Sequence, residues 1–130
     1  MTEQEVDELA EAFENRTLDR RAWTHEAHIA VCWHAVRRFG HTGALQHLRR
    51  AITSYNEATG TRNTSTEGYH ETITRYYVGV VADRADRELV DLLNDPDCAR
   101  DAPLRSWTRD VLFSSDARAG WVPPNRVSTR

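Results

Sequence analysis

Residues 24–40 form the clearest helical pattern in the chain and read Thr-His-Glu-Ala-His-Ile-Ala-Val-Cys-Trp-His-Ala-Val-Arg-Arg-Phe-Gly. Thr24 is a suitable N-cap because its hydroxyl can accept a hydrogen bond from the first turn, and Gly40 is a typical residue just past a helix end. One face carries side chains at steps of three and four residues: His25, His28, Ile29, Cys32, Val36 and Phe39. The two histidines should therefore point inward, as the apolar side chains do.

Further helices are predicted on both sides of this one. Apolar residues at helical spacing favour helices over residues 3–15, 41–58, 67–84, 88–93 and 104–113. Residues 61–68 are polar and form a loop, one of whose hydroxyls should cap the next helix. Residues 119–130 form an irregular tail, and the chain contains no internal repeat. The expected fold is a single all-α domain over residues 1–130, a bundle of four to six helices.

Composition narrows the class of protein. A chain of 130 residues with 39% hydrophobic residues can bury one modest core. It has no run of 18 apolar residues and its N-terminus is acidic, so we expect a cytoplasmic protein without a membrane segment. The formal charge of −3 argues against nucleic-acid binding. All 17 basic residues are arginine, which excludes Schiff-base chemistry through a lysine side chain. A homo-oligomer is left open.

A second chemically suggestive segment is Tyr69-His70-Glu71-Thr72-Ile73-Thr74. Adjacent residues on a helix diverge by about 100°, so His70 and Glu71 cannot easily point at one ion. His70 is the better candidate for a ligand, and Glu71 for a group that orients the ligands or carries protons. The structural alternative is a helix N-terminus at which Glu71 interacts with the helix dipole and His70 is half exposed.

Helices that pack across a core can bring His25, His28 and His70 together, with Glu71 close by. Three histidines with an open fourth position suit zinc, and a carboxylate as fourth donor also suits iron or manganese. The sequence therefore predicts a divalent metal site with His70 and Glu71 as catalytic groups, and no nucleotide cofactor. A small-molecule substrate would contact a set of nearby polar and aromatic side chains: Trp23, Tyr69, Thr74, Tyr76 and Arg118. The alternative for the early histidines is a pair of partly buried rings hydrogen-bonded to backbone or to an acid.

The two cysteines, Cys32 and Cys98, are too few for a disulfide framework, and both are expected to be free thiols. Cys32 lies one turn beyond His28 on the same face. A small core residue is the favoured interpretation for it, with a sulfur ligand as the alternative. Cys98 falls in a polar loop.

Three motifs together resemble a widespread family of small bacterial helical proteins. These are Trp23-Thr24-His25-x-x-His28, the central segment Gly68 to Thr74, and a closing pattern of Leu112-x-Ser114, Ala117-Arg118 and Trp121-Val122-x-Pro124. The resemblance covers nearly the full length and implies a shared fold and a shared site, but no particular activity. It implies a small apolar residue where this chain has Cys32, and an aspartate where it has Asn125.

Two other classes of function remain beside a metal-dependent enzyme. The same histidine and glutamate set could move protons without a metal, in an isomerase or cyclase. Alternatively the protein is a non-catalytic helical module that binds a ligand or a partner. Arg118 could receive a carboxylate or phosphate through its planar guanidinium, or it could be tied to a helix C-terminus or to an acid.

Overall fold

The structure, a computed structural model, describes residues 1–126, and its regular secondary structure over that range consists of helices joined by loops and turns. The α-helices are α1 (Glu3–Glu14), α2 (His25–Ala58), α3 (Glu71–Asp83), α4 (Leu89–Leu93), α5 (Arg109–Leu112) and α6 (Ser115–Ala119). Three short 3-10 helices are η1 (Arg20–Ala22), η2 (Pro96–Cys98) and η3 (Ala102–Arg105). The all-α prediction and its upper count of six helices are confirmed for this part of the chain.

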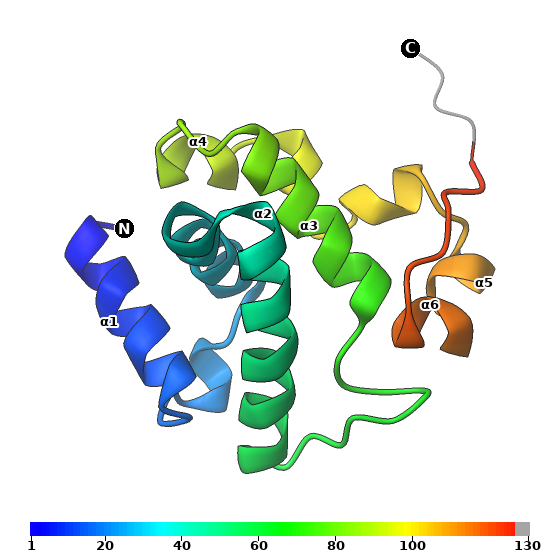
Figure 1. Cartoon of the computed structure of the whole chain (residues 1–130), viewed down its shortest axis with the longest axis horizontal. Coiled ribbons are helices and arrows are strands. Elements are labelled where there is room, and N and C mark those ends of the chain that lie inside the picture. Colours follow the sequence, from blue (N-terminus) through cyan, green and yellow to red (C-terminus); the bar gives the residue numbers. More distant parts are fainter. Residues whose placement is uncertain (127–130) are drawn as a thin grey trace.

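Helix α2 lies between α1 and α3 and packs against both (Figure 1). Helix α1 begins with a capping box, in which Thr2 and Glu5 each bond the other's backbone nitrogen, and it buries Val6, Ala10 and Phe13. The start of α2 is capped by Thr24, whose hydroxyl accepts a hydrogen bond from Ala27 N, as predicted. Helix α6 packs on α3 on the side away from α1.

Gly40 interrupts α2, which is therefore two helical halves joined at a corner. Its φ of +75° and ψ of −178° are non-helical, and this backbone region is essentially restricted to glycine. Close to the corner, a Cβ on Gly43 would lie 2.9 Å from Phe39 Cβ. The two halves consequently run in different directions, as Figure 1 shows. The predicted break at Gly40 is thus correct, although no loop separates the two halves.

Helix α3 begins later than expected. The predicted helix over residues 67–84 starts only at Glu71, because Gly68 has a φ of +85° and the backbone of His70 is extended. The predicted hydroxyl cap is wrong: the imidazole of His70 caps the helix, with Nδ1 accepting from Ile73 N at 3.1 Å. A Cβ on Gly68 would lie 2.3 Å from the carbonyl oxygen of Arg62, so the loop closes too tightly here for another residue.

The C-terminal third contains short helices and a returning tail. Helix α4 matches the prediction over residues 88–93, but the single helix expected over 104–113 is two separate turns, η3 and α5. Helix α6 was not predicted. Beyond it, residues 121–126 are non-helical, and Val122 is bonded from both sides: its N donates to Thr72 Oγ1 and its O accepts from Trp107 Nε1. The predicted irregular tail over residues 119–130 is therefore confirmed for residues 120–126, whereas Ala119 still belongs to α6, and residues 127–130 lie outside the described range.

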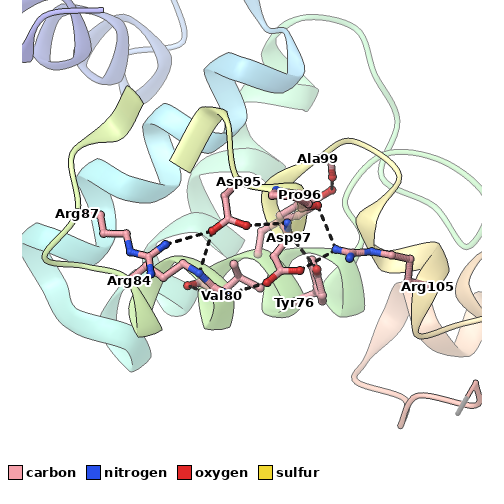
Figure 2. Close-up of polar contacts among 10 residues, drawn as sticks. Tyr76, Val80, Arg84, Arg87, Asp95, Pro96, Asp97, Ala99 and Arg105 are labelled. Atoms are coloured by element: carbon pink, nitrogen blue, oxygen red, sulfur yellow. Dashed lines mark hydrogen bonds and ion pairs between the residues drawn. The ribbon is translucent and has the colours of Figure 1, made fainter. Parts of the chain in front are cut away.

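An ion-pair network joins the C-terminal half of α3 to η2 (Figure 2). Arg84 contacts Asp95 through Nε at 3.0 Å and Asp97 through Nη2 at 2.6 Å. Arg87 and Arg105 add pairs to the same two acids, at 3.4 and 2.8 Å. The network holds the turn that carries Cys98 against α3. None of the described helices is long and apolar enough to cross a membrane.

The Gly40 corner can be tested by substitution. Gly40→Ala introduces a Cβ that meets nothing within 4 Å, so its effect reports backbone strain alone, and we expect a loss of about 1–3 kcal/mol in the free energy of unfolding. Gly79→Ala is the matched control, because it also meets nothing within 4 Å but lies inside α3, where alanine should be neutral or stabilising. Urea denaturation of both variants measures the difference, and equal stabilities would contradict the assignment.

Candidate functional site

A cavity of about 680 Å³ lies between the two halves of α2, helix α3 and the segment that follows α4. Polar groups line it from each element: His25 and His28 from α2, Thr74 and Tyr77 from α3, and Arg100 from the following segment. The remaining wall is largely apolar, with Ile29, Leu48, Ile52, Ile73 and Val78. A volume and a lining of this kind are typical of a site for a small organic molecule.

His25 is the first residue of α2 and is fixed by one hydrogen bond. Its Nε2 donates to the carbonyl oxygen of Cys98 at 2.7 Å, which requires that Nε2 carry the proton in the neutral ring. The ring also lies edge-on to Tyr77, with 5.5 Å between centroids. Nδ1 of His25 is thereby left as the acceptor.

His28 is fixed in the complementary way. Its Nδ1 donates to the carbonyl oxygen of Thr24 at 2.6 Å, and its ring stacks against Trp23 with 3.8 Å between centroids. The unprotonated nitrogen of the neutral ring is then Nε2. His28 is exposed to solvent and also lines the cavity, so that protein atoms enclose only part of the ring. Desolvation by these atoms lowers the pKa of His28, and the hydrogen bond to Thr24 opposes the shift only in part. The ring is therefore neutral near pH 7.

Both cysteines line this cavity as buried free thiols. Burial raises the pKa of Cys32 far above its ordinary value and that of Cys98 to about 11, so neither is a thiolate at neutral pH. This agrees with the favoured interpretation of Cys32 as a core residue. The backbone of Cys98 makes a further contact, because its carbonyl oxygen orients His25.

His70 does not line the cavity. Besides capping α3 through Nδ1, it donates from Nε2 to the carbonyl oxygen of Leu112 at 2.6 Å. Both ring nitrogens are thus in use, and the side chain is buried, not half exposed. Desolvation lowers the pKa of His70, and the bond to Leu112 opposes this shift. In this arrangement His70 links the start of α3 to the C-terminal helices.

Glu71 points to a different side of α3 from the cavity. Its carboxylate accepts two hydrogen bonds from Arg49, at 2.9 Å from Nε and 2.6 Å from Nη2, and a third from the Tyr69 hydroxyl at 2.7 Å. Burial raises the pKa of Glu71, but the bonds from Arg49 and Tyr69 outweigh it and the pKa is lowered overall. Glu71 is a carboxylate held by a forked arginine, and such bidentate pairs are among the stronger polar contacts in proteins.

Tyr69, Glu71 and Arg118 line a second hollow of about 770 Å³, called here the arginine groove because Arg49, Arg75 and Arg118 all line it. Arg118 Nη1 donates to the carbonyl oxygen of Gly68 at 2.9 Å. Its Nε is buried and has no hydrogen-bond partner within residues 1–126. A buried donor without an acceptor costs about 1–3 kcal/mol, so this nitrogen calls for an explanation.

The predicted site residues are therefore divided between two places. Trp23, His25, His28 and Thr74 line the cavity, whereas Tyr69, Glu71 and Arg118 line the arginine groove. In the described part of the chain, His70 and Tyr76 line neither. The hydroxyl of Tyr76 donates to Asp97 O at 2.9 Å, beside the ion-pair network (Figure 2).

Four residues that are important at these sites were not selected from the sequence: Tyr77, Arg49, Arg75 and Arg100. Tyr77 lies on the apolar face of α3 with Ile73 and could have been found there, because a tyrosine on such a face brings a hydroxyl into a buried wall. Its hydroxyl donates to Ala99 O at 2.6 Å. Arg49, Arg75 and Arg100 gave no signal, since the sequence contains 17 arginines and nothing local distinguishes these three.

In comparisons with protein-family models, curated proteins and solved structures, none matches this chain. The family resemblance of the three motifs thus stays a prediction. Among residues 1–126, no group of three or more histidine, cysteine, aspartate or glutamate side chains is arranged to hold a metal ion. The reason is geometric. His70 is bonded to Leu112 and Glu71 to Arg49, so His25 and His28 are the imidazoles that remain at the cavity with a nitrogen free.

The lowered pKa of His28 predicts a pH dependence of stability. Folding keeps this ring neutral at a pH where an ordinary histidine, with a pKa of about 6.5, takes up a proton. Its contribution is complete above that pH and is lost as the pH falls towards the lower folded-state value. We therefore expect a smaller loss of stability between pH 7 and pH 5 in His28→Gln than in the wild type.

Urea denaturation at each pH measures this difference. His41→Gln is the control, because His41 is exposed and lies outside the cavity, and it should behave as the wild type does. The assignment is wrong if His28→Gln shows the wild-type pH dependence.

Proposed function

We propose that the protein binds a small organic molecule in the cavity and that His28 accepts a proton or a hydrogen bond from it. One observation carries the proposal: Nδ1 of His28 is bonded to Thr24 O, so Nε2 is the basic nitrogen on a ring that lines the cavity. A positioned neutral imidazole is the commonest general base in enzymes. The proposal therefore has two steps: the cavity binds the molecule, and His28 then accepts a proton from it.

The lining favours a ligand with an apolar body and one polar or ionisable group. Polar side chains gather where the start of α2 meets residues 98–100, since His25 bonds Cys98 and Tyr77 bonds Ala99. Arg100 lines the same region and can attract a negative charge. The apolar side chains of both halves of α2 and of α3 would cover the rest of the molecule.

The reaction class that we propose is proton transfer within one molecule, as in an isomerisation or a cyclisation. In such a reaction His28 Nε2 removes a proton, and the same ring returns it at another atom. Glu71 is not the partner of His28 in this scheme, because it is paired with Arg49. The carboxylate that lines the cavity is Glu26, which lies at the exposed start of α2.

A ligand screen tests binding directly. We expect members of a panel of small weak acids with apolar bodies to raise the melting temperature of the wild type and of His41→Gln. His28→Gln should bind the same compounds at least tenfold more weakly, because a hydrogen bond to the basic nitrogen is lost. Isothermal titration measures the affinities. Hits that bind all three proteins equally would contradict the role of His28, and the absence of any hit from a broad panel would contradict the cavity as a binding site.

A metal-dependent variant is the second candidate. Metal-bound histidines commonly donate their other ring nitrogen to a backbone carbonyl, which is how His25 and His28 are held. Two imidazoles one turn apart would supply two ligands, and the ligand molecule or water the others. Zinc, iron and manganese all accept imidazole donors.

Elemental analysis after purification without chelators tests the metal-dependent variant. It predicts about one metal ion per chain in the wild type and in His70→Ala, and its loss in His28→Ala, because His70 is not at the cavity. Loss of the metal in His70→Ala as well would instead favour the site predicted from the sequence, in which His25, His28 and His70 all bind the metal. If no metal is found and added zinc or iron(II) leaves the melting temperature unchanged, the metal-dependent variant is wrong.

A further inference from the structure

The arginine groove lies on a different face of α3 from the cavity and gathers positive charge from three helices. Arg49 comes from α2, Arg75 from α3 and Arg118 from α6. Hydroxyl and amide groups line it as well: Thr53, Asn63, Thr64, Ser65 and Ser115. Such a combination of guanidinium and hydroxyl donors suits the oxygens of an anion.

The charge in the groove is not balanced. Arg49 is neutralised by Glu71, which it holds through Nε and Nη2. Within residues 1–126, neither Arg75 nor Arg118 forms an ion pair. Asp116 is the other acid in the lining, so the groove retains a net positive charge.

Arg118 is held in a way that leaves one edge of its guanidinium unused. Nη1 is anchored on Gly68 O, and the buried Nε has no partner among the described residues. Nε and Nη2 form the edge with which arginine grips a carboxylate or phosphate through two parallel hydrogen bonds. Arg49 donates from the same two atoms to the carboxylate of Glu71. Arg118 has no such carboxylate partner among the described residues.

Arg75 is held at the rim of the groove. Its guanidinium carbon lies 4.8 Å from the centre of the Trp121 ring, in a cation–π arrangement that limits its freedom. The Arg75 guanidinium is therefore already held in place before an anion binds at this rim.

We propose that the arginine groove binds the oxyanion of a small phosphorylated or carboxylated molecule, with Arg118 gripping it through Nε and Nη2 and Arg75 adding charge from the rim. The site is separate from the cavity, and the proposal does not depend on the proposed function of His28.

Titration with inorganic phosphate and with succinate at constant ionic strength tests this site. We expect saturable binding of at least one of them to the wild type; the phosphate arm identifies a phosphoryl ligand and the succinate arm a carboxylate ligand. Arg75→Gln should weaken the binding about tenfold, since a positive charge beside the anion is lost. Arg75 is exposed and bonds no backbone atom of the described chain, so the variant should fold normally.

The matched control is Arg37→Gln, which removes another exposed arginine stacked on a tryptophan, 4.5 Å from the Trp33 ring and outside the groove. It should bind both anions as the wild type does. Arg118→Lys keeps the charge but not the planar fork, and it should also bind more weakly. Equal weakening by Arg37→Gln, or no saturable binding of either anion to the wild type, would overturn the proposal.

Discussion

The backbone conformation of Gly40 sets the shape of the whole molecule. Without a break, the 34 residues of α2 would form a straight helix about 51 Å long. A straight helix could line only one side of a cavity. The positive φ at Gly40 turns the chain, so that the half carrying His25 and His28 and the half carrying Leu48 and Ile52 both face α3. The conformation that only glycine adopts readily at residue 40 thus allows both halves of α2 to line the candidate site.

A second constraint, the double hydrogen bond of His70, separates the two candidate sites. By capping α3 and holding Leu112, this imidazole joins the central helices to the C-terminal segment. Its neighbour Glu71 then projects toward Arg49, while Ile73, Thr74 and Tyr77 face the cavity. The motif of residues 69–74 therefore contributes side chains to two surfaces of α3. His70 lines neither site and instead fixes the start of the helix that carries both surfaces.

Local signals in the sequence were enough for most of the helices. Thr24, Gly40 and the apolar spacing of α1 and α2 act within a few residues, so their consequences can be predicted without the fold. The start of α3 was predicted too early, because an imidazole is an unusual cap and its orientation depends on Leu112, 42 residues away. The divergence of His70 and Glu71 followed from helical geometry, but the partners of each did not. His25 bonds a carbonyl 73 residues away and Glu71 an arginine 22 residues away, and no local pattern encodes these distances.

The long-range ¹H–¹⁵N NMR spectrum of the imidazoles tests directly whether His25, His28 and His70 have three distinct, fixed roles. With each histidine assigned by substitution, we expect a proton on Nδ1 of His28 and on Nε2 of His25 and His70 at neutral pH. Both nitrogens of His70 should also keep their hydrogen-bonded signals after a metal or a ligand is added. A proton on Nε2 of His28, or a His70 ring that exchanges between tautomers and responds to added metal, would contradict the division of the site.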